Sequence, residues 1–244
     1  MSSALLTTPR SVLRPPASSI GLLRERHLHA TLRRWYAEPG DREEAPVDGY
    51  VIDLVRGDLL IEIQTRGFAG VKPKIKALLR GGHPIRVVHP IAIDRWIVNV
   101  DPDGAVLSRR LSPRHGDLAD IASELVTFPE LIAHEHFEVE VLLTAEEEYR
   151  HHVPGMCWRR KGWTVLERRL VEVVDRIVLA EPADLMRLLP AEMPERFTTA
   201  ELALAIKRPR RVAQHMAYCL AKVGVIEAVG KRGHAAEYER SSSV

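Results

Sequence analysis

Apolar and polar positions alternate with two different periods along the first hundred residues. Leu22, Leu23, Leu28, Leu32 and Trp35 recur at roughly helical spacing, which predicts a helix over residues 20–37. Two short β-branched runs follow, "DGYVIDLVR" and "LLIEIQT", with Gly57 and Asp58 between them. Two such runs around a tight turn predict a β-hairpin. The polar stretch "EPGDREEAP", which precedes the hairpin, is expected to be a loop.

The next segment continues the alternation of helices and strands. "VKPKIKALLR" predicts a helix with Pro73 in its first turn, and "HPIRVVHPIA" and "RWIVNVDPDG" predict two further strands. The predicted order is therefore helix, strand, strand, helix, strand, strand. Helices packed on a mixed sheet bury the apolar faces of such a series most economically. The expected fold class is α/β, a mixed sheet flanked by helices.

The middle of the chain has a less regular pattern. Residues 117–143 are expected to be mostly helical, and "TAEEEYRHHVPG" is expected to be a polar linker. "GWTVLERRLVEVVDRIVLAEPADLMRLLP" predicts one long amphipathic helix followed by a short one. The chain is thus divided into a disordered tail (1–19), a first domain (20–145), a linker (146–160) and a C-terminal unit (161–240).

The C-terminal unit has the clearest local signals. "FTTAELALAI" begins with a capping box from Thr198 to Glu201, and "RRVAQHMAYCLAKVG" is a second helix that ends at Gly224. "VIEAV" and "EYER" then flank a glycine-containing basic turn, which predicts a two-stranded wing. Two helices joined by a short turn and followed by a hairpin predict an α+β winged-helix domain.

Composition narrows the possible functions without naming one. The 244 residues carry a formal net charge of only +2, so any nucleic-acid surface must come from local clustering of cations. Cys157 and Cys219 lie far apart, which argues against a disulfide framework or a cysteine zinc site and favours a cytoplasmic setting. No apolar run approaches the roughly 20 residues that a membrane span requires. The acid-free first 24 residues resemble a transit peptide in composition, although a disordered tail is the favoured interpretation.

Each strand of the predicted hairpin contains an acidic residue, although most of its other residues are apolar and predict a buried strand. Asp53 lies in the first strand, and Glu62 and Gln64 lie on one face of the second, because side chains alternate along a strand. If the strands pair, Asp53 and Glu62 converge at one end of the sheet. Two buried carboxylates close together require positive charge, and Mg²⁺ commonly uses one or two carboxylates with water and a phosphate.

These residues resemble the signature of the PD-(D/E)xK nuclease superfamily, whose core is restriction-endonuclease-like. The matching positions are Glu25 in the first helix, Asp53, and, after eight intervening residues, Glu62 with Gln64. The resemblance implies catalysis by these four residues, Mg²⁺ or Mn²⁺ held by Asp53 and Glu62, cleavage of DNA, and possible homodimers. The pairing with a winged helix is similar to an uncharacterised bacterial family. Gln64 departs from the usual lysine, and Lys72, Lys74 or Lys76 could supply the cation instead.

The C-terminal unit carries cations where a winged helix meets DNA. The candidate DNA-binding residues are Lys207, Arg208, Arg210, Arg211, Gln214, Lys231 and Arg232. The arginines and lysines suit phosphates, whereas Gln214 suits a base edge. Three hypotheses stay open: a metal-dependent deoxyribonuclease, a catalytically inactive DNA-binding or regulatory protein with the same fold, and a protein-interaction module. The histidines of "HEH" and "HH" match no known zinc spacing.

Overall fold

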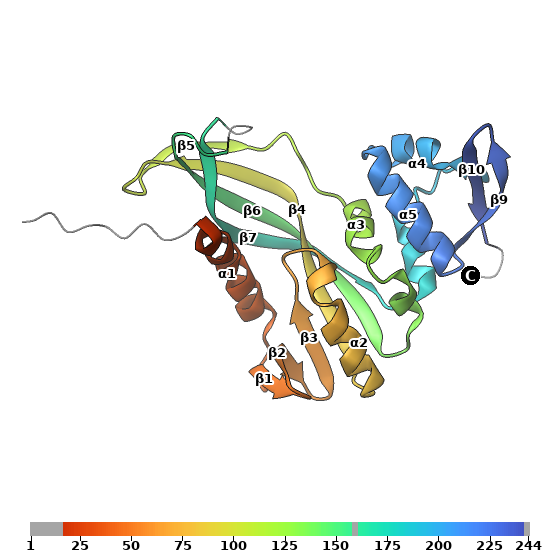
Figure 1. Cartoon of the computed structure of the whole chain (residues 1–244), viewed down its shortest axis with the longest axis horizontal. Coiled ribbons are helices and arrows are strands. Elements are labelled where there is room, and N and C mark those ends of the chain that lie inside the picture. The colour runs from red at the N-terminus through yellow and green to blue at the C-terminus, as the bar shows by residue number, and fades with distance from the viewer. Residues whose placement is uncertain (1–16, 158–160, 242–244) are drawn as a thin grey trace, which may run out of the picture.

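The computed structural model describes residues 17–157 and 161–241, with side chains described from His27 onward. Of the tail expected over residues 1–19, residues 1–16 lie outside the described part, and residues 17–19 belong to helix α1 (Ala17–Tyr36). The chain folds as a mixed α/β structure in which helices flank a large mixed sheet, as the sequence predicted (Figure 1).

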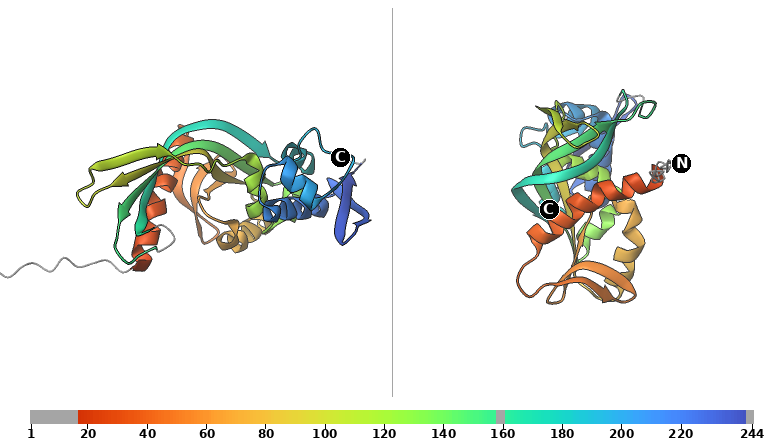
Figure 2. Two further views of the ribbon diagram at one scale, coloured as in Figure 1. Left: turned by 90° about the horizontal axis from the view of Figure 1, so that it is seen from above. Right: turned by 90° about the vertical axis from the view of Figure 1, so that its left-hand side faces the viewer.

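Seven strands of the described chain form this sheet, in the order β1-β2-β3-β4-β6-β7 with β5 paired to β4. The strands β3, β4 and β6 run parallel, and the other pairs are antiparallel. Their bounds are β1 Arg42–Val47, β2 Tyr50–Arg56, β3 Leu59–Ile63, β4 Ile85–Val100, β5 Val106–Leu111, β6 Phe137–His152 and β7 Trp163–Leu179. The long strands β4, β6 and β7 extend beyond the helices and, with β5, form a curved arm (Figure 2).

Helices and helical turns cover both faces of the part of the large sheet that lies outside the arm. On one face, Leu28, Leu32 and Tyr36 of α1 pack against strand residues such as Ile61 and Leu142. The other face packs against α2 (Lys72–Arg80), α3 (Ala122–Leu125) and the 3-10 turns η1 (Phe68–Gly70), η2 (Leu118–Ile121) and η3 (Pro129–Ala133). No helix of the described chain is long and apolar enough to cross a membrane.

The C-terminal part contains the two expected helices and the expected hairpin. Its elements are η5 (Pro182–Leu188), β8 (Arg196–Thr198), α4 (Thr199–Ala205), α5 (Arg210–Lys222), β9 (Ile226–Arg232) and β10 (Ala235–Arg240). The Thr198–Glu201 capping box is present, and Gly224 follows α5 in the left-handed region with φ 78°. Strand β8 was not predicted; it joins the hairpin as a third strand in the order β8-β10-β9.

Two predictions for residues 144–179 are wrong. The segment expected to be a polar linker continues β6 to His152, and the expected long helix is strand β7. The prediction of a linker was wrong because Glu146 and Glu148 are buried in the strand and form ion pairs with arginines. Their polarity therefore does not indicate a loop. The prediction of a long helix was wrong because the pairing of β6 with β7 contains three register shifts. Such bulges break the two-residue alternation of a strand and produce helix-like apolar spacing.

Three smaller differences have similar causes. Residues 85–100 form one strand, β4, rather than two, because a bulge at Ile93 carries the strand through the polar positions that suggested a break. The expected loop before the hairpin is the exposed edge strand β1. Residues 117–136 form only short helical turns, since β6 begins at Phe137.

Candidate functional site

Asp53 lies where β2 and β3 separate. Backbone pairing of the two strands runs from Arg56↔Leu59 to Leu54↔Ile61. At the next position the Asp53 carboxylate accepts the backbone N–H of Ile63, with Oδ2 2.8 Å from the nitrogen. A side chain thus replaces the next strand-to-strand hydrogen bond. Asp53 and Glu62 lie one residue beyond the last paired residues, Leu54 and Ile61, and are close enough for the charge of Asp53 to act on Glu62.

Glu62 is buried, with 8% of its surface exposed, and two side chains donate hydrogen bonds to it. The Lys74 ammonium lies 2.5 Å from Oε2, and the Gln64 amide nitrogen lies 3.0 Å from Oε1. Burial and then the charge of Asp53 raise the pKa of Glu62, while Lys74 and His29 act in the opposite direction. The site therefore holds a carboxylate pair that one lysine only partly compensates.

Of the three lysines considered from the sequence, Lys74 is the one that reaches this site. It also donates to the Val51 carbonyl at 2.5 Å. Lys72 donates to the Thr127 carbonyl at 2.6 Å, and Lys76 forms an ion pair with Glu130 at 3.1 Å. Residues four apart share a helix face whereas residues two apart do not, so Lys72 and Lys76 point away from the face that carries Lys74.

The sequence did not identify His29 as a site residue. Its Nε2 lies 3.2 Å from Asp53 Oδ2, and this contact raises the pKa of His29 against the effect of burial. Glu25, the helix acid considered from the sequence, lies one turn earlier on α1, but its side chain is outside the described part. The four-residue spacing from Glu25 to His29 was the available clue, since it places both on one face of a helix.

The donor set around Asp53 fits a hard divalent cation. Two carboxylates and the Gln64 amide lie together, and the mutual repulsion of the carboxylates favours binding of positive charge. The described residues contain no group of three or more His, Cys, Asp or Glu side chains that could enclose a metal. A site with two carboxylates suits Mg²⁺ or Mn²⁺, which complete their coordination with water and phosphate oxygens, better than a closed zinc site.

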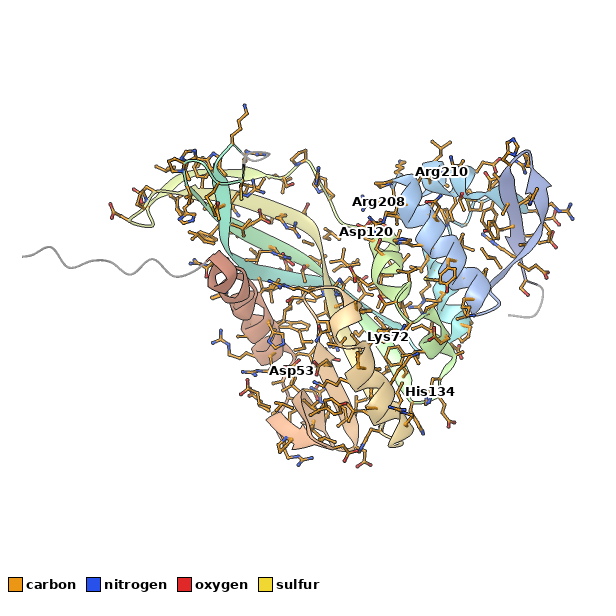
Figure 3. All side chains as sticks on the ribbon, viewed as in Figure 1. Asp53, Lys72, Asp120, His134, Arg208 and Arg210 are labelled. Carbon is orange, nitrogen blue, oxygen red and sulfur yellow. The ribbon has the colours of Figure 1, made fainter. Side chains whose placement is uncertain are left out.

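The predicted DNA-binding residues fall into two groups. Lys207, Arg210, Arg211, Gln214 and Lys231 are exposed. Tyr218, unpredicted and 51% exposed, lies on the same face of α5 as Arg211 and Gln214. Arg208 and Arg232 are instead held by acids: Arg208 by Asp120 at 3.2 Å, and Arg232 by Glu201 and Glu237. In Figure 3, Arg208 lies beside Asp120, and Asp53 lies across the molecule from Arg210.

Comparisons with known proteins cover mainly the large sheet. The sequence model of a family described as "Domain of unknown function (DUF8091)" matches residues 26–180, which include β1 to β7 and most of α1. An uncharacterised protein of Treponema pallidum (strain Nichols) is 28% identical over 186 residues, which are 76% of this chain and 74% of that protein. No solved structure matches the chain significantly.

Proposed function

We propose that this chain, which belongs to the DUF8091 family, is a metal-dependent nuclease of the PD-(D/E)xK type that hydrolyses phosphodiester bonds in DNA. One observation carries the proposal: where β2 and β3 separate, the Asp53 carboxylate acts electrostatically on the buried Glu62 carboxylate, and the Lys74 ammonium lies against Glu62. Two acids and one cation are also the charged residues of the PD-(D/E)xK signature that the sequence resembles. The cation comes from α2 instead of from position 64.

Each side chain has a role that follows from its contacts. Asp53 and Glu62 would hold Mg²⁺ or Mn²⁺, which supplies an acidified water and neutralises phosphate charge. Gln64 can hydrogen-bond the attacking water, and Lys74 supplies the positive charge that Gln64 lacks. His29 keeps the Asp53 carboxylate oriented through its contact with Oδ2. Glu25 remains a candidate fourth catalytic residue.

The architecture is compatible with this proposal. Apart from the added strand β1, the order α1, β2, β3, α2, β4 is the helix–strand–strand–helix–strand order that the resemblance implies, and the order α4, α5, β9, β10 is the one expected of a winged helix. In a helix–turn–helix unit, the N-terminal part of the second helix enters the major groove of DNA. Arg210 and Arg211 begin α5, and Gln214 and Tyr218 continue the same exposed surface. This surface would deliver the DNA.

The test uses labelled duplex, single-stranded and branched DNA with Mg²⁺, Mn²⁺ or EDTA. We expect cleavage that requires metal and falls at least a hundredfold in Asp53→Asn and in Glu62→Gln. Asp58→Asn, an exposed acid in the turn of the same hairpin, is the matched control and should cleave like the wild type. Cleavage that persists in both site variants, or intact DNA with every metal and substrate, would contradict the nuclease proposal.

The DNA-delivery surface has a separate test. Arg210→Ala combined with Arg211→Ala should weaken duplex binding and reduce the slope of log K against log salt by about 2, because each lost phosphate contact releases about one counterion fewer. Arg187→Ala is the control, since Arg187 is an exposed arginine that pairs with Asp184 and is not part of the proposed surface. An unchanged slope in the double variant would exclude this surface from DNA binding.

A second candidate is a catalytically inactive DNA-binding or regulatory protein with the same fold. Two observations favour it: Gln64 replaces the usual lysine, and His29 and Lys74 already contact the two carboxylates. This candidate predicts DNA binding without cleavage. It also predicts a thermal unfolding midpoint that Mg²⁺ and Mn²⁺ leave unchanged, whereas metal binding at the site would raise it.

A further inference from the structure

A second cleft lies between the sheet and the turn that precedes α5, with a volume of about 860 Å³. Its walls are the β4 segment 89–92, the loop 113–116, the region from η2 to α3, and residues 208–212. The side chains of Asp53, Glu62 and Lys74 do not line this cleft. Its volume is within the range of small-molecule binding sites, which is about 300–1,000 Å³.

One wall of the cleft is fixed in place by Gly116. The Gly116 N–H donates to the Ala92 carbonyl at 2.9 Å, and His115 Nδ1 lies 3.0 Å from the Ile93 carbonyl. A Cβ added at Gly116 would lie 2.5 Å from the Ala92 oxygen, so the loop approaches β4 as closely as the backbone allows. The cleft is therefore formed by a loop docked against the bulge of β4.

Cations line the cleft, and one of them has a buried donor without a hydrogen-bond partner. Arg95, Arg114 and Arg208 face two acids, Asp120 and Glu124, among the lining residues. The Nε atom of Arg95 is buried and has no hydrogen-bond partner among the described residues, whereas the Nε atom of Arg208 lies 3.2 Å from Asp120 Oδ1 in an ion pair. Within the described part of the chain, the ion pairs of Arg95 are long, at 3.6 Å to Glu146 and 4.0 Å to Glu148. A guanidinium group with an unused donor, together with the exposed guanidinium of Arg114 in the same cleft, is suited to an anion, above all to a phosphate.

The remaining lining is apolar and carries a few hydrogen-bonding groups. Pro90, Ile91, Pro113, Pro209 and Val212 provide apolar surface against which a flat ring can lie. Ser123 and the two acids provide acceptors for hydroxyl or amino groups. A phosphate, a ring with an apolar face and a few hydroxyl or amino groups together describe a nucleotide.

We propose that this cleft binds a nucleotide through its phosphate, either free or at the end of a nucleic-acid strand. Arg208 and Asp120, which form an ion pair, both line the cleft, and a phosphate there would compete with Asp120 for Arg208. Arg208 precedes α5 by two residues, so the bound phosphate connects the large sheet with the helix that carries Arg210. The site is distinct from the Asp53 site and does not depend on cleavage.

Isothermal titration of the full chain with defined probes tests the proposal. The probes are 2′-deoxyadenosine 5′-monophosphate, deoxyadenosine, and a thymidine tetranucleotide with and without a 5′-phosphate. We expect the phosphorylated probes to bind at least tenfold more tightly than their unphosphorylated counterparts. A stronger signal from the free monophosphate identifies a free nucleotide as the ligand, and a stronger signal from the phosphorylated tetranucleotide identifies a strand end.

Variants locate the binding. Arg114→Ala and Arg208→Ala should each weaken binding at least tenfold, and exposed Arg114 can be removed without disturbing a buried contact. Arg110→Ala, on the neighbouring β5 but outside the cleft, should bind like the wild type. Asp53→Asn should also bind unchanged, which separates this proposal from the nuclease proposal. Absence of binding by every probe, equal binding of deoxyadenosine and its monophosphate, or wild-type affinity in Arg114→Ala would overturn it.

Discussion

At the residue scale, the ion pair between Lys74 and Glu62 has the greatest consequence for the candidate site. Both side chains are largely buried, so water screens their interaction less than it screens a surface pair. Removing one partner from such a pair leaves a desolvated charge, which destabilises more than the pair itself stabilises. The stability of the protein therefore reports on the geometry of the site even without a substrate.

Lys74→Met should lower the free energy of unfolding by about 2 kcal/mol, because Glu62 would remain buried without its cation. Lys76→Met is the matched control on the same helix. Its ion pair with Glu130 is exposed on both sides, so the expected loss is below about 0.5 kcal/mol. Urea unfolding of the two variants measures both changes in the free energy of unfolding. Adding Glu62→Gln to Lys74→Met should recover part of the loss, and equal losses in the two lysine variants would contradict the buried pair.

We expect His89 to make the stability of the fold depend on pH. The side chain is buried beside Phe68, and its Nδ1 donates to the Gln64 carbonyl at 2.7 Å. Burial lowers the pKa of His89, although the charge of Glu124 and the Gln64 carbonyl oppose this effect. A histidine with a lowered pKa stays neutral in the folded state while the unfolded chain takes up a proton. The folded state then loses stability as pH falls below about 6.5.

The expected result is a difference between wild type and His89→Phe that grows as pH falls from 7.5 to 5. The wild type should lose up to about 1.4 kcal/mol per pH unit more than the variant, the limit for one proton. Urea unfolding at several pH values measures the difference. His234→Phe, at an exposed turn, should keep the wild-type slope. Parallel pH profiles for wild type and His89→Phe would show that His89 is not the group responsible.

At the element scale, β4 joins the two parts of the sheet. Its first half pairs in parallel with β3 and β6 in the core, and its second half pairs with β5 in the arm. The bulge at Ile93 divides the halves, and the loop 112–117 docks there through Gly116. A bulge bends a strand and increases its local twist, which explains why the arm curves away from the helices.

Gly116→Ala should therefore destabilise the fold by about 2 kcal/mol, because the new methyl group meets backbone that has no room to move. Gly230→Ala is the matched control in strand β9, since nothing lies within 4 Å of the added Cβ. Thermal and urea unfolding of the two variants give the comparison. A Gly116→Ala protein as stable as the control would mean that the loop does not dock against Ala92.

At the scale of the whole molecule, one apolar cluster joins the sheet to the C-terminal helices. It includes Val139 of β6, Leu125 of α3 and Leu220 of α5. The Cys219 thiol, also in this cluster, lies 3.8 Å from the Ala122 carbonyl, and burial raises its pKa to about 12. Figure 1 shows α5 against α3 at the end of the molecule opposite the arm. The C-terminal unit is thus packed on the sheet by a shared core.

A shared core predicts a single cooperative unfolding transition for the full chain. Calorimetry should give one peak whose calorimetric and van't Hoff enthalpies agree. Leu220→Ala and Val139→Ala should shift this same peak to lower temperature, each by an amount that corresponds to about 2–4 kcal/mol. Two separate peaks, with Leu220→Ala moving only one of them, would instead indicate independent domains.

Several features followed from the sequence by itself because they depend on neighbours along the chain. The β2–β3 hairpin, the helices α1, α2, α4 and α5, and the capping box of α4 all rest on periodicity or turn chemistry within a few residues. Strand alternation then placed Asp53, Glu62 and Gln64 together before any tertiary contact was known. These local rules determined the central part of the candidate site.

Only the tertiary structure decided the rest, because those features depend on residues distant in the chain. The pairing of β6 with β7 makes strands of segments that read as linker and helix, since partners across a bulged ladder outweigh local spacing. The packing of α2 and α1 selected Lys74 from three lysines and brought His29 to Asp53. The docking of α5 on α3 turned Arg208 toward Asp120 and left Arg210 exposed, because burial of the helix's apolar face fixed its rotation.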